Sequence, residues 1–364
     1  MKKIATITFL LLTATLIQAT VRTVSNNPAT LAQYNTIQAA INASSSGDTI
    51  YVHGSPNDYA GFVIEDKRLV VIGPGWSPDK SFPFTARVGQ SNIAGTTGDP
   101  LTNPANDTEI QGLTFTSNVL TYVSFGNDHP NGLKFIRNEF QNIVYVQETG
   151  TYKNYLFEGN YFNTGRVSAS GNSNYENFLF QNNIFYDANT WQINDFTNST
   201  NVLFNHNLFY GPSNTPNNIF TGTCRFLTFT NNIFVRRNAA NGCSFTVFNN
   251  NITYNSGTNN PWAVNSNSDA GGNVVNQDPL MVAQASVNSG TNNPLLDFTI
   301  ASGPANNSGS DGKDMGLLYD PTGSLNWSNS RNSRLPRIYT MNITNPTIPV
   351  GGTLNVQVEG RKSN

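Results

Sequence analysis

Residues 178–185 read Phe-Leu-Phe-Gln-Asn-Asn-Ile-Phe, and this phrase decides the fold because it recurs along the chain. An apolar residue is followed two places on by a second one, then by Asn three places later and by another apolar residue after two more. A constant phrase with spacers of 18 to 25 residues indicates a stacked solenoid. The copies are Leu113/Phe115/Asn118/Leu120, Leu133/Phe135/Asn138/Phe140, Tyr155/Phe157/Asn160/Phe162, Phe178/Phe180/Asn183/Phe185, Val202/Phe204/Asn207/Phe209, Leu227/Phe229/Asn232/Phe234 and Phe245/Val247/Asn250/Ile252.

The phrase also fits the centre of a leucine-rich repeat, so the kind of solenoid has to be argued. A leucine-rich repeat needs a further Leu three residues upstream, where this chain has Pro130, Tyr152, Tyr175, Ser199, Cys224 and Gly242. The second half of each unit lacks helix-forming sequence and offers strand-like runs instead, such as 143–146, 166–169, 191–193 and 218–221. Several short strands per unit joined by Asn and Gly turns predict an all-β protein, a parallel β-helix.

The Asn column is predicted to lie at a bend between strands, inside the coil. Each amide would donate to the carbonyl of the next, because identical residues stack at strand spacing. Buried amides in register are structural by default, and we interpret these asparagines in that way rather than as a binding site. The column comprises Asn118, Asn138, Asn160, Asn183, Asn207, Asn232 and Asn250.

The two cysteines, Cys224 and Cys243, each precede a copy of the phrase. In a stacked coil such positions lie on adjacent rungs, roughly 4.8 Å apart, near the lower end of the Cα separations that a disulfide allows. We therefore predict a Cys224–Cys243 disulfide, on the condition that the chain meets an oxidising compartment. The alternative is two buried thiols.

The chain opens with Met1-Lys2-Lys3, an apolar run and Ala19, which is typical of a secretory signal over residues 1–19. Residues 20–47 are predicted to form an N-terminal cap with a short helix, and residues 48–320 the coil, with 77–108 as a long excursion from it. Residues 321–335 form a polar linker, and two strands follow within 336–364. We expect a secreted, periplasmic or cell-surface protein.

Composition limits the partners. The formal net charge is −2 and 12% of residues are charged, so the basic footprint of a nucleic-acid-binding protein is absent. No segment after the signal is apolar enough to span a bilayer, so we expect no membrane span.

The cap sequence Thr36–Ile41 followed by Gly47–Val52 resembles the start of secreted right-handed parallel β-helix proteins of bacterial type, with the pectin-lyase-like fold. The Asp278-Pro279-Leu280 phrase and the segment 302–316 resemble the closing coils of the same proteins. The resemblance implies a right-handed coil but leaves the activity open, since the fold carries lyases, hydrolases, epimerases and adhesins.

The enzyme motifs of these families are absent. The chain has no Asp-Asp pair, Gly-His-Gly or Arg-x-Lys of the polygalacturonase type. The run Arg334-Leu335-Pro336-Arg337 has the wrong spacing for the pectate-lyase motif. Whether the protein is an enzyme is therefore left open.

Candidate site residues gather in the early rungs. A lyase acting on uronate polymers needs a base and positive charge near the reacting carbon, which suggests Lys134, Arg137, His129 and Arg166 as catalytic candidates. Candidates for binding are Asp128, Lys153, Glu158 and Trp191. Arg137 and Glu158 occupy nearly equivalent places on consecutive rungs, where a surface salt bridge is the simpler interpretation.

Two further features are open to interpretation. Asp311 and Asp314 offer oxygens for calcium, although one Asp-Gly-Lys-Asp spacing is far short of an EF-hand loop and favours a turn. Leu156, Leu179 and Leu203 should face outward on three rungs, and we expect a loop such as 77–108 to cover them.

The hypothesis is a secreted, carbohydrate-related β-helix protein that binds polysaccharide. A polysaccharide lyase and a structural or adhesive surface protein are the alternatives.

Overall fold

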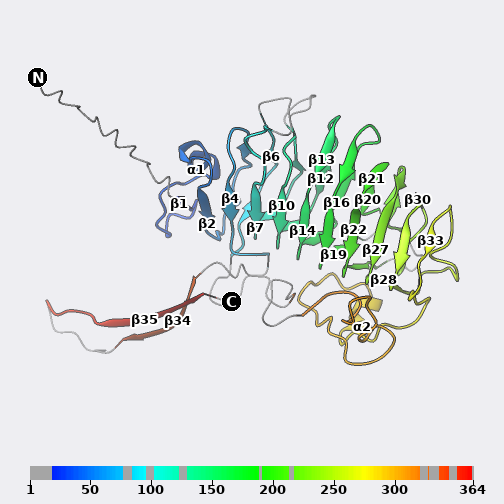
Figure 1. The fold of residues 1–364 in the computed structure, drawn as a ribbon. Coiled ribbons are helices and arrows are strands. Elements are labelled where there is room, and N and C mark those ends of the chain that lie inside the picture. The colour runs from blue at the N-terminus through cyan, green and yellow to red at the C-terminus, as the bar shows by residue number, and fades with distance from the viewer. Residues whose placement is uncertain are drawn as a thin grey trace, which may run out of the picture.

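The computed structural model describes residues 19–76, 84–95, 102–122, 129–187, 191–212, 217–319, 327, 336–343 and 351–362. The predicted fold is confirmed: consecutive coils lie on one another along one axis and form a parallel β-solenoid (Figure 1). Residues 1–18, almost the whole predicted signal, lie outside the described residues. No described helix is long and apolar enough to cross a membrane.

Three parallel sheets form the faces of the coil. Sheet A comprises β1 (Val21–Val24), β2 (Thr49–Val52), β4 (Val70–Ile72), β7 (Glu109–Gln111), β10 (Lys134–Ile136), β14 (Leu156–Glu158), β18 (Leu179–Gln181), β22 (Val202–Asn205), β27 (Leu227–Thr230), β31 (Val247–Asn249) and β33 (Ser268–Asp269). Sheet B comprises β5 (Arg87–Val88), β8 (Thr114–Phe115), β11 (Glu139–Phe140), β15 (Tyr161–Asn163), β19 (Ile184–Tyr186), β23 (Leu208–Tyr210), β28 (Ile233–Val235) and β32 (Ile252–Tyr254).

Sheet C comprises β3 (Val63–Ile64), β6 (Ser91–Ile93), β9 (Val119–Leu120), β12 (Ile143–Val146), β16 (Arg166–Ala169), β20 (Ile193–Asn194) and β25 (Phe220–Thr221). Smaller parallel sheets join β13 (Thr151–Lys153), β17 (Asn174–Glu176) and β21 (Asn198–Thr200), then β24 (Asn217–Asn218) with β29 (Arg237–Asn238), and β26 (Cys224–Arg225) with β30 (Cys243–Ser244).

The first coil is closed by helix α1 (Ile37–Ala43), as predicted. The Thr36 side chain accepts a hydrogen bond from the Ala39 amide and so satisfies one of the open donors at the start of the helix. Ile37, Ala40 and Ile41 are buried, and they face the core beside β1 and β2. The helix therefore covers apolar surface that the first coil would otherwise expose.

Phenylalanine columns fill the coil, because inward-facing residues of paired strands fall directly above one another. In sheet A the Phe180 and Phe204 rings are stacked 4.3 Å apart, and Phe204 and Phe229 are 4.4 Å apart. A second column on sheet B contains Phe162 and Phe185 at 4.4 Å. These stacked, fully buried rings are the main apolar contribution to the core.

The Asn ladder is present at the bend between sheets A and B. The Asn183 amide nitrogen donates to the Asn207 side-chain oxygen at 2.9 Å and to the Phe157 carbonyl at 2.9 Å. The Asn183 backbone N–H donates to the same Asn207 oxygen at 2.9 Å, so each rung is tied to the next by three bonds. The same bonding runs through Asn138, Asn160, Asn183, Asn207, Asn232, Asn251 and Asn273.

Two ladder residues are predicted wrongly. Leu113 occupies the ladder position of its rung, where its backbone N–H donates to Asn138, and Asn118 lies at a later bend, where its side chain accepts from the Ile143 amide. On the last predicted rung the ladder residue is Asn251, and the Asn250 side chain points out to donate to Ser308. At both ends of the repeat, the sequence fits the phrase in one register, but the strands of the coil pair in another.

Left-handed residues mark both bends that flank sheet A. The entry column, which precedes the sheet A strands, comprises Asp107, Gly132, Asn154, Asn177, Asn201, Phe226 and Phe245, with φ between 52° and 71°. The exit column, immediately before the ladder, comprises Gly112, Arg137, Gly159, Asn182, His206, Asn231 and Asn250, with φ between 50° and 64°. Gly and Asn accept this conformation readily, which explains most of these residues.

The segment 281–319, here called the tail, covers the outer face of sheet B and lies beside the coil in Figure 1. It contains helix α2 (Gln284–Asn288). Apolar side chains of sheet B such as Leu208 and Ile233 pack against Val287, Phe298 and Met315 of the tail in a second apolar cluster. The sequence suggested irregular closing coils here; the tail instead runs back along the exit column.

Contacts from four side chains of the exit column help to anchor the tail. Asn250 donates to the Ser308 carbonyl at 2.9 Å, and Asn231 accepts from the Ser310 amide at 2.7 Å. A His206 ring nitrogen lies 3.1 Å from the Gly316 carbonyl, and the Asn182 side chain accepts from the Leu318 amide at 2.7 Å.

The predicted disulfide is not formed. Cys224 and Cys243 pair in register on β26 and β30, as expected, but both are buried free thiols. Each thiol faces a carbonyl of its own rung, that of Thr221 for Cys224 and that of Ala240 for Cys243. Side chains stacked at the strand spacing of about 4.8 Å are farther apart than the Cβ separation of about 3.8 Å that a disulfide prefers.

The excursion predicted over 77–108 is also partly wrong, because β5 and β6 within it are strands of the coil. Residues 77–83 and 96–101 lie outside the described residues. Leu156, Leu179 and Leu203 are register partners on the outer face of sheet A, and each is half-buried. Near the C-terminus, β34 (Pro336–Ile343) and β35 (Val356–Lys362) pair antiparallel with each other.

Candidate functional site

The early rungs bring together three predicted residues, two on the outer face of sheet A and one in the bend that follows β10. Lys134 on β10 and Glu158 on β14 lie on neighbouring strands, and Arg137 follows β10 in the exit column. The Arg137 backbone N–H donates to the Glu158 carbonyl at 2.8 Å. Glu109 on β7, which the sequence reasoning missed, is the register partner of Lys134.

Burial sets the charge properties of this group. It lowers the pKa of Arg137, and the Glu158 carboxylate opposes that shift. Burial raises the pKa of Glu158, with Arg137 acting against the shift and Glu109 adding to it. Proton abstraction requires a base, and the negative charge that develops requires a nearby cation. A carboxylate and two cations on adjacent rungs meet both requirements.

His129 does not join that group. Its side chain is fully buried, and its ring stacks on Tyr152 with centroids 3.8 Å apart. Among the described residues neither ring nitrogen has a hydrogen-bond partner, and burial lowers the pKa of His129 to about 4. The ring therefore acts as a member of the aromatic packing.

The other predicted candidates are dispersed. The Arg166 guanidinium lies over the Trp191 ring, 4.8 Å from its centroid, so these two residues pack on each other. Lys153 forms a 2.8 Å salt bridge with Glu176 on the neighbouring strand β17. Asp128 lies outside the described residues.

The two aspartates considered for calcium are engaged in the tail. Asp311 lies 3.1 Å from a His206 ring nitrogen, and Asp314 accepts from the Asn307 amide at 2.8 Å. Within the described residues, no group of three or more His, Cys, Asp or Glu side chains has the proximity that a metal ion requires.

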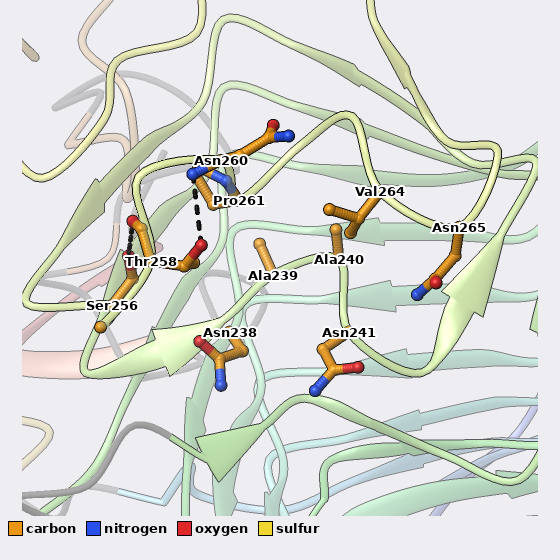
Figure 2. A pocket seen from close by; sticks show the side chains of 11 residues that line it. Asn238, Ala239, Ala240, Asn241, Ser256, Thr258, Asn260, Pro261, Val264 and Asn265 are labelled. Atoms are coloured by element: carbon orange, nitrogen blue, oxygen red, sulfur yellow. Dashed lines mark hydrogen bonds between the residues drawn. The ribbon is translucent and has the colours of Figure 1, made fainter.

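A pocket of about 520 Å³ opens at the late rungs, where the sequence reasoning placed no candidate (Figure 2). It lies between the turn 238–241, after β28, and the loop 256–265, which connects β32 to β33. Trp262 in this loop is buried against Phe234 and Phe248, so its ring fastens the loop to the core of the coil. The pocket therefore rests on a fixed loop.

The chemistry of the pocket is uniform: its lining contains no ionisable side chain. Ala239, Ala240 and Pro261 lie buried beneath the pocket, Val264 is half-buried at its wall, and Asn241 and Asn260 are exposed. The remaining lining residues are Asn238, Ser256, Gly257, Thr258 and Asn265. Amides and hydroxyls beside apolar surface suit a neutral ligand that has both hydroxyl groups and C–H faces.

Hydrogen bonds orient this lining. Asn238 and Asn241 both donate to the Asn218 side-chain oxygen, at 3.2 and 2.9 Å. The Asn260 backbone N–H donates to the Thr258 hydroxyl at 3.2 Å, and the Ser256 hydroxyl donates to the Thr258 carbonyl at 3.2 Å (Figure 2). The polar groups are thus positioned before any ligand arrives. The only sequence signal was the density of Asn, Ser and Thr in two segments outside the repeating phrase.

Comparisons with known proteins are limited. No family model and no curated protein matches the chain. Two solved structures of pectin methylesterase are similar, one in complex with hexasaccharide VII and one of a mutant in complex with hexasaccharide IV. Each is 12% identical and covers 64% of this chain and 79% of its own, with TM-scores of 0.25 and 0.24. Matches at this level carry no argument about activity.

Proposed function

We propose that this protein binds carbohydrate in the pocket between residues 238–241 and 256–265. The observation that carries the proposal is a lining of amides and hydroxyls beside apolar surface with no ionisable side chain. Sugars present hydroxyls that exchange hydrogen bonds with amides, and C–H groups that pack on apolar side chains. The volume of about 520 Å³ lies within the usual range of about 300–1,000 Å³ for small-molecule sites.

The ligand class follows from charge. A uronate would bring a carboxylate into a pocket whose lining offers no cation, so the proposal favours neutral sugars. Export is part of the proposal, supported by the signal-like sequence Met1–Ala19. A polysaccharide outside the cell is then the expected partner.

The test is calorimetric titration with neutral and uronate-containing oligosaccharides. Asn241→Ala and Asn260→Ala should each raise the Kd for a neutral glycan about tenfold, because each removes hydrogen-bonding groups worth about 1.4 kcal/mol. Asn259→Ala is the matched control, since Asn259 is exposed in the same loop but does not line the pocket. An equal loss of affinity for the neutral glycan in all three variants would contradict the proposal. Tight binding of uronate-containing oligosaccharides alone would also contradict it.

The early rungs support a second candidate, a polysaccharide lyase. Lys134 and Glu158 lie on the outer face of sheet A beside the buried Arg137, and the raised pKa of Glu158 suits a proton acceptor. Incubation with pectate, alginate and glycosaminoglycans should then give unsaturated products that absorb in the ultraviolet, and Glu158→Gln should abolish them. No absorbance change with any of these polymers would remove this candidate. Attachment of the protein to the cell surface, with neither glycan binding nor ultraviolet-absorbing products, would indicate a structural or adhesive protein.

A further inference from the structure

The entry column changes character at Phe226 and Phe245, and Ser266 continues it on the next rung with φ of 63°. Five rungs place Asp, Gly or Asn in this left-handed bend, which are the residues that accept positive φ with least strain. Phe226 and Phe245 follow, with φ of 59° and 52°. A bulky aromatic residue in this conformation is a genuine outlier. Folding alone does not account for this choice.

The two rings are also exposed. Relative exposure is 51% for Phe226 and 50% for Phe245, although both lie on a coil whose other phenylalanines are largely buried. The rings stack on each other, with centroids 5.4 Å apart and planes 18° apart. The result is a two-ring apolar surface on adjacent rungs. Backbone strain that leads only to exposed apolar surface points to a contact outside the chain.

This aromatic pair lies next to the pocket along the chain. Pocket residue Asn241 is four positions before Phe245, with the short strand β30 between them. The Thr246 backbone N–H donates to the Asn267 side-chain oxygen of the following rung at 3.0 Å, and the strand register places Ser266 next to Phe245. Ser266 directly follows pocket residue Asn265. Both segments that line the pocket therefore lead into the aromatic pair.

We propose that Phe226 and Phe245 form a second subsite of the same glycan site, so that the ligand is a neutral oligosaccharide or polysaccharide chain rather than a single sugar. One sugar unit of the glycan occupies the pocket, and the C–H faces of the next sugar units pack on the exposed rings. This inference rests on the proposed function, because the pocket supplies the hydrogen bonds that fix the chain's position.

The test uses the double variant Phe226→Asn/Phe245→Asn. Asparagine is the residue that the preceding rungs use at this bend, so the variant relieves backbone strain and should melt at the same temperature as the wild type or higher. Loss of binding could then not be ascribed to unfolding. Val282→Asn is the matched control, because it also replaces an exposed apolar side chain, 64% exposed, on the tail.

The probes are cellotetraose with glucose, and N-acetylchitotetraose with N-acetylglucosamine, titrated by calorimetry. The wild type should bind at least one tetrasaccharide more tightly than its monosaccharide. The double variant should lose about tenfold in affinity for that tetrasaccharide, with monosaccharide affinity and the Val282→Asn control unchanged.

Three results would overturn the inference. Undiminished tetrasaccharide binding by the double variant, or a wild type that binds a monosaccharide as tightly as the tetrasaccharide, would exclude the second subsite while leaving the pocket proposal intact. A wild type that binds none of the four probes would remove the pocket proposal and the inference together.

Discussion

The Asn ladder and the entry column both run up the coil at one residue per rung, yet they differ in what constrains them. From Asn138 to Asn251 the ladder is buried, and each amide in it is hydrogen-bonded to the rungs before and after it. The entry column is set mainly by backbone conformation, so Asp, Gly, Asn and even Phe occur there. Buried polar groups fix residue identity, whereas an exposed bend fixes only φ and leaves the side chain open to other uses.

The largest expected effect is in the ladder. Asn207→Leu removes the acceptor of both the Asn183 backbone N–H and the Asn183 amide, each at 2.9 Å, and the partner of the Phe180 carbonyl. Each stranded buried group costs about 1–3 kcal/mol, so the free energy of unfolding should fall by about 4 kcal/mol in urea denaturation. Asn201→Gly in the entry column is the control and should change it by less than about 0.5 kcal/mol. Similar losses in both variants would erase the distinction between the two columns.

A second prediction concerns His129, one of the buried polar residues that lack the pairing seen in the ladder within the described part of the chain. His129→Phe keeps the stacking on Tyr152 and removes two ring nitrogens without partners, so stability at pH 7 should rise by about 1–2 kcal/mol. Denaturation midpoints of the two proteins measure this difference. A loss of stability would show that the imidazole nitrogens are satisfied.

The same residue predicts a pH dependence. Because the folded pKa of about 4 lies below the ordinary 6.5, the unfolded chain binds the proton more readily between these values. Stability should therefore fall as pH drops from 6.5 to 4, by on the order of 3 kcal/mol. His129→Phe should remove that decline, whereas a decline of equal size in the variant would assign it to other groups.

The smallest effect is expected in the exit column. Asn182→Gly keeps the left-handed bend, as Gly159 does one rung earlier, and removes the bond to the Leu318 amide. The free energy of unfolding should fall by about 1 kcal/mol. Hydrogen exchange should accelerate at Leu318 and leave the ladder amides protected; faster exchange throughout the coil would show that the tail and the coil unfold as one unit.

The sequence was most informative where the phrase repeats without ambiguity. Ladder positions from Asn138 to Asn232 could be predicted because only one register places both aromatic columns inside. At the ends this condition fails: Leu113 takes the place of an Asn, and the run Asn249-Asn250-Asn251 offers three registers that differ by one residue. The loop 256–265 and the turn 238–241 carry no periodic signal, so their meeting as a pocket required the structure.

The cysteines show a different limit. Their adjacency on two rungs followed from the spacing, but bond formation depends on the direction of each thiol, and both point to carbonyls of their own rung. His129 teaches the same lesson: chemical type suggested catalysis, and only the position of Tyr152 shows that the ring is packed away.

The tail acts as a ruler for the coil. Its contacts at Asn250, Asn231, His206 and Asn182 are spaced along one continuous segment, so that segment measures the distance between those rungs. Insertion or deletion of a whole rung between these residues would preserve every stacked column, but the tail could no longer reach all four of its partners at once. Asn292 of the tail extends this constraint to β15 through Tyr161 and Asn163, so these contacts leave the length of the coil unconstrained only before β15.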